Sequence, residues 1–223
     1  MISSCVPYAA IPPLPAVVPG YVSSPDSGAV LAQQLAPVLY LQRDERFRLE
    51  RVVAVLHPDR RLIAYHLLWQ DDAHGAWLPF TKGTDQELLW VGYDGTGAPT
   101  DLWTYWHGAI LHADWDGRGQ LGANVQWGKH GTLPKGVIEA DLPALQSLTS
   151  FYLYTWAIPD LWLGSLVREG PRCFCFGPAR YREFTQPVIL GARLDAIVRT
   201  ANPDGALSAV FGADYSRKPE WPN

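Results

Sequence analysis

Apolar runs separated by turn-forming residues dominate the chain up to residue 135. Residues 52–56 and 62–69 are almost continuously apolar, and residues 58–61 between them have the composition of a turn. A strand exposed on one face alternates apolar and polar residues, whereas these two do not. The pattern therefore predicts a hairpin covered on both faces, preceded by a shorter apolar strand at residues 38–41.

A second hairpin is predicted further along. Residues 87–94 and 102–111 read as strands, and the glycines and proline of residues 94–100 between them are typical of a tight connection. Aspartates and glycines form another turn at residues 114–119, and residues 121–127 form the next strand.

Helical patterns are few. Helices are predicted at residues 26–35, 142–150 and 187–199, from capping residues or from apolar positions spaced three and four apart. Five prolines between residues 7 and 19 remove amide donors, so residues 1–25 are expected to be an extended arm. Residues 216–223 are expected to be a tail.

Composition supports the same fold class. The chain has 223 residues, of which 12% are aromatic, with 20 glycines and 19 prolines, a balance that favours sheets over a helical bundle. The length suits one sizeable domain. We predict a mainly β protein, a β-sandwich with a few peripheral helices, whose single domain covers residues 26–215 with helical additions after residue 140.

Charge and hydropathy narrow the choice of partners. The net charge is −4 and lysines and arginines are scattered, so no basic stripe indicates nucleic-acid binding. No apolar run approaches about 18 residues, so no transmembrane segment is expected. Residues 1–20 lack the basic start and apolar centre of a signal peptide, so the protein is either cytosolic or has lost a leader. Cys173 and Cys175 lack the second pair of a zinc ribbon, and we read them as small buried hydrophobes.

Acidic residues and histidines concentrate in the predicted sheet. Asp85 and Glu87 are two residues apart in an extended segment, so they share a face and could bind one divalent ion together. All 6 histidines lie between residues 57 and 130. His107 is expected to share a face with Trp103 and Tyr105. The metal-site hypothesis uses Asp72, Asp85, Glu87, His107 and His130; the alternative is a solvated strand entrance beside histidines that belong to the sheet.

Standard enzyme signatures are absent from the sequence. There is no Gly-x-Ser-x-Gly elbow, phosphate-binding glycine loop, His-Glu-x-x-His helix or dinucleotide fingerprint. This lowers the expectation of an enzyme. A metal-assisted hydrolase stays open, with Glu87 as the base acting on a metal-bound water.

Several motifs together resemble a known family. They are an aromatic strand ending in Asp71 and Asp72, the Asp85-Gln86-Glu87 triplet, a Gly-Ala-Pro turn at residues 97–99, and His107 and His130, each followed by glycine. In this arrangement residues 38–135 resemble the necrosis- and ethylene-inducing-like proteins (NLPs) and related vacuolar-sorting-associated sequences. The resemblance implies a β-sandwich with a divalent cation near its surface and, in the toxin branch, recognition of a glycosylated membrane lipid.

The match to the family motif Gly-His-Arg-His-Asp-Trp-Glu is partial. Asp85 and Glu87 match its two acids, whereas Lys82, Thr84 and Gln86 replace its two histidines and its tryptophan. A protonated lysine is not a metal ligand and repels a cation. The ion is therefore either lost, bound differently, or replaced by Lys82 in a salt-bridged pocket.

Three functions remain open from the sequence. The first is an exported NLP-like protein that binds a divalent cation (calcium, magnesium, manganese or zinc) and a glycan or lipid headgroup, with membrane activity as an added possibility. Its expected contact residues are Lys82, Trp103, Tyr105 and Lys129. The second is the hydrolase described above, and the third is a structural or partner-binding domain without chemistry.

Overall fold

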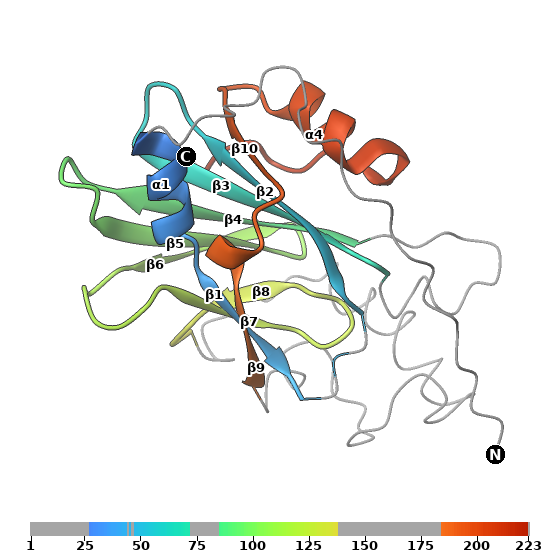
Figure 1. The fold of residues 1–223 in the computed structure, drawn as a ribbon. Coiled ribbons are helices and arrows are strands. Elements are labelled where there is room, and N and C mark those ends of the chain that lie inside the picture. The colour runs from blue at the N-terminus through green and yellow to red at the C-terminus, as the bar shows by residue number, and fades with distance from the viewer. Residues whose placement is uncertain (1–26, 44, 46, 72–84, 138–183, 223) are drawn as a thin grey trace, which may run out of the picture.

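Two β-sheets pack against each other around a shared apolar core, which confirms the predicted β-sandwich (Figure 1). The structure, a computed structural model, describes residues 27–43, 45, 47–71, 85–137 and 184–222. Two short α-helices, α1 (Ser27–Gln34) and α4 (Asp204–Phe211), lie at the periphery of the described residues. In this part of the chain no helix has the length and apolar character needed to cross a membrane.

The larger sheet has six strands and contains both predicted hairpins. Neighbouring strands are antiparallel except β10, which runs parallel to β2 at one edge. In spatial order the strands are β10 (Ala196–Arg199), β2 (Leu49–Leu56), β3 (Leu62–Trp69), β4 (Asp85–Tyr93), β5 (Pro99–Trp106) and β6 (Ala109–Asp114).

The smaller sheet has four strands drawn from distant parts of the chain. Its β1 strand is central, parallel to β7 on one side and antiparallel to β9 on the other. In spatial order the strands are β8 (Thr132–Pro134), β7 (Gly122–Val125), β1 (Val38–Gln42) and β9 (Phe184–Ile189).

Strands β2 and β3 are buried on both faces, as their continuous apolar runs predicted, and β4 is buried on both faces as well. On β3, Tyr65 and Trp69 point into the inner core between the two sheets. Ala64 and Leu68 point to the other side, into an outer core that α4 and β10 cover. Alternate residues of one strand thus enter two different cores, which explains why neither face needs polar residues.

The predicted helix at residues 187–199 is wrong. This stretch contains the end of β9, a short 3-10 helix at Leu190–Ala192 and β10. Pairing with β1 and β2 supplies the backbone hydrogen bonds that a helix would otherwise provide. Gly191 sits between the two strands, where a Cβ atom would lie 2.3 Å from the carbonyl oxygen of Gln33. Tertiary pairing therefore overrides the helical spacing of the apolar residues.

The single strand predicted at residues 102–111 is a hairpin. His107 and Gly108 form the two-residue turn between β5 and β6, and both have positive φ, 49° and 95°. Two consecutive residues with positive φ are the mark of a tight hairpin turn whose twist matches that of its strands.

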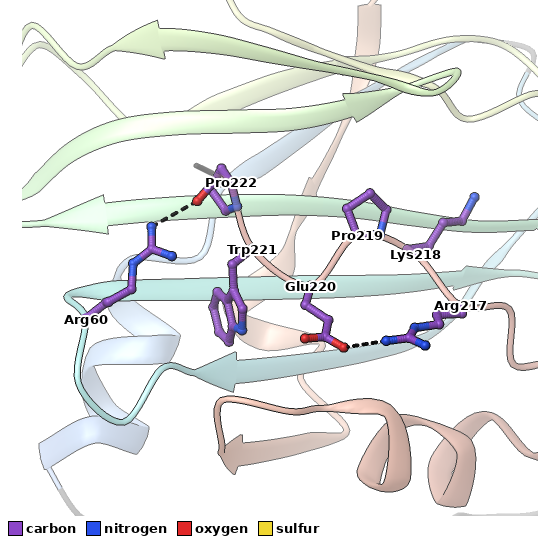
Figure 2. A pocket seen from close by; sticks show the side chains of 7 residues that line it. All are labelled: Arg60, Arg217, Lys218, Pro219, Glu220, Trp221 and Pro222. Carbon is purple, nitrogen blue, oxygen red and sulfur yellow. Dashed lines mark hydrogen bonds and ion pairs between the residues drawn. The ribbon is translucent and has the colours of Figure 1, made fainter.

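Residues 216–222, the described part of the expected tail, lie along the outer face of the larger sheet. The indole nitrogen of Trp90 donates to the carbonyl oxygen of Glu220 at 2.9 Å, and Arg60 donates to that of Pro222 at 2.9 Å. A groove of about 360 Å³ lies beside this segment. Figure 2 shows Arg60, Trp221 and the Arg217–Glu220 pair, which line it. The segment is part of the packed structure.

Some expectations fall outside the described residues. They are the arm at residues 1–25, the helix at residues 142–150, and the segment containing Cys173 and Cys175. The helix predicted at residues 26–35 is confirmed as α1.

A buried histidine in the outer core should make the protein sensitive to acid. His66 on β3 is 1% exposed, and among the described residues neither ring nitrogen has a hydrogen-bond partner. Burial lowers its pKa to about 3. Below about pH 6.5 the His66 side chain therefore binds a proton in the unfolded chain but stays neutral in the folded chain. The free energy of unfolding falls as the pH drops below this value.

We expect His66→Leu to remove this loss. The difference in unfolding free energy between variant and wild type should grow by about 1.4 kcal/mol for each pH unit between about pH 6 and 4. Urea unfolding at several pH values measures it, and the acidic residues common to both proteins cancel in the comparison. Parallel stability curves for the two proteins would show that His66 is not buried in its neutral form.

Candidate functional site

A buried ionic cluster lies at the end of the sandwich where β4 begins. His130 donates through Nδ1 to Asp85 Oδ2 at 2.9 Å, and its Nε2 lies 3.5 Å from Glu45 Oε1. The His130 and Glu45 side chains are 0% and 2% exposed, and that of Asp85 is 15% exposed. The cluster therefore reaches solvent only along Asp85.

Backbone amides and a stacked aromatic ring hold this cluster in place. Glu45 accepts hydrogen bonds from the amides of Phe47 at 3.0 Å and Gly128 at 2.8 Å. The ring of His130 stacks on Trp69, with ring centroids 4.0 Å apart and planes 5° apart. The Glu45 carboxylate thus joins the loop after β1 to the loop after β7, and Trp69 fixes the His130 imidazole between these two loops.

Positive backbone angles aim the two histidines of this region. His107 has φ 49° and His130 has φ 52°, and they are the two non-glycine residues with positive φ among the described residues. Residues other than glycine rarely adopt this conformation, and they cluster at functional sites when they do. Both turns therefore carry strain that the surrounding contacts must offset.

The turn at His107 reverses the side to which its ring points. His107 was expected to share a face with Trp103 and Tyr105, and this is wrong. Its Nε2 lies 2.6 Å from Oε1 of Gln126, in the loop after β7, on the inner side of the sheet. Period-two alternation ends with the strand at Trp106, so it does not extend to a residue in the turn.

Glu87 lies beside the cluster with an unpaired oxygen. It pairs across strands with Leu67, which belongs to the inner core, so its side chain faces the space between the sheets. It is 5% exposed, and among the described residues its Oε2 has no hydrogen-bond partner. A buried carboxyl oxygen without a donor is costly, so this position is a candidate ligand site.

The charged groups of the cluster shift the pKa values of their neighbours in opposite directions. Burial alone would lower the pKa of His130, but Glu45 and Asp85 raise it to about 9. Burial alone would raise the pKa of Glu45, yet His130 and the amide donors bring it below its ordinary value. Burial and then the charge of Asp85 raise the pKa of Glu87 to about 8. At neutral pH His130 is thus a cation between two carboxylates.

The expected site residues separate onto two faces of the larger sheet. Asp85, Glu87, His107 and His130 lie on the inner side. Trp103 and Tyr105 lie on the outer side, where the ring of His112 stacks on Trp103 at 4.8 Å and the ammonium of Lys218 lies 5.1 Å from the ring centroid of Tyr105.

Of the other expected residues, Lys129 is buried in the loop after β7, next to His130. Its positive charge helps to lower the pKa of His107 to about 4, for which burial is the main cause. Asp72 and Lys82 lie outside the described residues.

Two members of the inner cluster were missed from the sequence. Glu45 belongs to the charged turn that the composition of residues 43–46 predicts, and Trp69 is the last residue of the apolar run at residues 62–69. The loops after β1 and β7 meet only in three dimensions, since the Gly128–Glu45 hydrogen bond spans 83 residues. A lone glutamate in a charged turn carries no signal that it will be buried.

A second group of possible metal ligands lies on the outer face. Asp101, His112 and Asp114 each place one ligand atom within 4.8 Å of the others. Among the described residues, no other group of three or more such side chains meets this distance. None of its members was expected in a metal site.

Comparison with known proteins gives a likeness to solved structures alone. No family model matches the chain, and no curated protein matches it. Four chains of solved structures match. NLPPya in complex with mannosamine and NLPPya in complex with glucosamine each align at 14% identity and a TM-score of 0.40, over 57% of this chain and 74% of theirs.

A third solved structure is described as a toxin fold for microbial attack and plant defense. It aligns at 11% identity and a TM-score of 0.35, over 51% of this chain and 70% of its own. The two NLPPya structures belong to the family that the sequence motifs resemble. At such identities and TM-scores the likeness says nothing of activity, so the residues of this chain must support any function assigned to it.

Close packing around His107 yields a first test of the site. A Cβ atom on Gly131 would lie 2.8 Å from Nε2 of His107 and 3.1 Å from Cδ1 of Trp106. We expect Gly131→Ala to displace the His107 ring and to lower the free energy of unfolding by about 1–3 kcal/mol. Gly205→Ala is the matched control, because a Cβ there meets no atom within 4 Å. Equal stability of the two variants in urea unfolding would refute the packing argument.

The charge of His130 yields a second test. His130→Asn keeps a residue that tolerates positive φ but leaves Asp85 and Glu45 without their cation, which should cost about 3–5 kcal/mol near neutral pH. Because the folded-state pKa of His130 is raised, its contribution is complete below about pH 6.5 and is lost as the pH rises through about 9. The stability gap between wild type and variant should therefore narrow over that range. A constant gap would mean that His130 is neutral in the folded protein.

Proposed function

We propose that this chain is an NLP-like binding protein that holds a divalent cation at Asp85 and Glu87 and uses it to bind a glycan or a lipid headgroup. One observation carries the proposal. Two carboxylates of one strand face the same inner end of the sandwich, and an oxygen of Glu87 is buried without a donor among the described residues. Carboxylate oxygens are the ligands that hard divalent cations prefer.

The surrounding groups fit such a cation. His130 donates to Asp85 and is itself held by Glu45 and Trp69, so it positions a ligand carboxylate from behind. In this proposal His130 is a positioning residue, because both of its ring nitrogens already face carboxylates. The neutral ring of His107 adds a polar group on the same side of the sheet.

Access is consistent with a surface-reaching site. Asp85 is the partly exposed member of the cluster, so a ligand would approach along it. A bound cation would supply positive charge for sugar hydroxyl or phosphate oxygens. The motif resemblance supports a glycan or glycosylated lipid as the ligand, and it supports export of the protein.

A hydrolase remains the second candidate because of one property of Glu87. A carboxyl group with a pKa near 8 holds its proton at neutral pH and could act as a general acid or base. If the protein is a hydrolase, Glu87→Gln should abolish turnover of a glycan substrate while its binding persists. If the site binds through a cation, the same change should reduce binding itself.

We therefore expect Glu87→Gln to weaken cation binding and headgroup binding together. Metal content is measured by mass spectrometry, and thermal unfolding is followed with and without chelator, since an ion that binds only the folded state raises its melting temperature. Binding is then measured on vesicles that contain a glycosylated lipid and on vesicles of plain phosphatidylcholine. On chelation the melting temperature of the wild type should fall and its vesicle binding should be lost. Glu87→Gln should show the lower melting temperature and the loss of vesicle binding before any chelator is added.

Asp59→Asn is the matched control, because it removes one carboxylate from an exposed turn. It should behave as the wild type does. The proposed cation would be ruled out if the wild-type protein contains no ion and its melting temperature does not change with calcium, magnesium, manganese or zinc. A domain without chemistry would then be the function left.

A further inference from the structure

We propose that the outer face of the β5–β6 hairpin holds a second metal site, formed by Asp101, His112 and Asp114, that takes a first-row transition-metal dication such as zinc. The donor set is one imidazole nitrogen and two carboxylate oxygens. Imidazole nitrogen with carboxylate oxygen suits zinc and its neighbours better than calcium or magnesium, which prefer oxygen alone.

The site lies on the opposite side of the sheet from Asp85 and Glu87. Thr104 of β5 donates to the carbonyl oxygen of Thr132 in the smaller sheet at 2.8 Å, so Thr104 faces inward. Asp101 and Trp103 alternate with it and therefore face outward. The two sites can be tested independently, because the six-stranded sheet separates them.

The distances already approximate those around one ion. The Nε2 atom of His112 lies 2.8 Å from Oδ1 of Asp101 and 3.6 Å from Oδ1 of Asp114. Two ligand atoms bound tetrahedrally to zinc at its usual bond lengths are about 3.4 Å apart. Small side-chain rotations would thus bring the three atoms onto an ion.

The hairpin register places two like charges where a cation would relieve them. Asp101 and Asp114 stand directly opposite each other on neighbouring antiparallel strands. Two carboxylates in that relation destabilise a hairpin unless a positive charge lies between them. In this structure His112 bridges the two carboxylates through a hydrogen bond to Asp101 and a contact of 3.6 Å to Asp114, and a dication held by all three side chains would compensate both charges at the same place.

Neighbouring residues hold two of the ligands in place. Trp103 pairs with His112 across the strands, and their rings stack with centroids 4.8 Å apart and planes 18° apart. The carboxylate of Asp101 lies over Gly92 of β4, where a Cβ atom would come within 3.0 Å of Oδ2. A side chain on Gly92 would therefore push Asp101 away. Asp114 is 93% exposed, which leaves the remaining coordination positions open to solvent.

Zinc titration of the full chain by calorimetry, with any affinity tag removed, tests the proposal. The wild type should bind one zinc ion here, and His112→Gln and Asp114→Asn should each weaken that binding by at least about tenfold. Asp116→Asn removes a neighbouring exposed carboxylate and should leave the affinity unchanged. Zinc should also raise the melting temperature of the wild type more than that of His112→Gln.

The outcomes separate this site from the one proposed above. Zinc binding that is lost in His112→Gln and kept in Glu87→Gln supports the outer site, whatever becomes of the inner one. Zinc binding that is unchanged in both His112→Gln and Asp114→Asn overturns it, as does a wild type that binds no zinc. Zinc binding lost in Glu87→Gln alone would assign the ion to the inner site and also overturn the outer one.

Discussion

The inner end of the sandwich depends on one buried imidazolium. Glu45 and Asp85 belong to different segments, and burying either carboxylate alone would be costly, so His130 compensates both. The same contact fixes where the loop after β7 lies, because Gly128 donates to Glu45 and the His130 ring rests on Trp69. The fixed position of the His130 charge therefore determines where the candidate ligand carboxylates lie.

The larger sheet divides the chemistry of the molecule in two. Alternation along β4 sends Glu87 inward and Trp90 outward, and alternation along β5 sends Thr104 inward and Trp103 outward. A sequence read along the chain places these residues in one neighbourhood, whereas the sheet gives them different surroundings. Acidic and histidine side chains consequently form a buried cluster on one side and an exposed one on the other.

The sequence predicted what local patterns determine and failed where distant segments meet. The β2–β3 hairpin follows from continuous apolar runs, and the shared face of Asp85 and Glu87 follows from a period of two. The helical interpretation of residues 187–199 failed because apolar residues in two short strands joined by Gly191 also fall three and four apart. His107 was placed on the wrong face because its backbone φ is positive, which turns its ring to the other side of the sheet. In the sequence, only the glycine that follows His107 could have suggested such a turn. The burial of Glu45 depends on a loop met 83 residues later, which no local pattern records.

The outer core has a consequence for how the chain folds. Its apolar face on β2, β3 and β4 is covered by β10, α4 and the segment that follows them, so the cover comes from residues after 195. Parallel pairing of β10 with β2 joins residues more than 140 positions apart, as the hydrogen bond from Val52 to Asp195 across 143 residues shows. Contacts of such long range slow folding. A newly made chain therefore carries an unprotected apolar sheet until residues 196–223 have been made, and in that interval aggregation competes with folding.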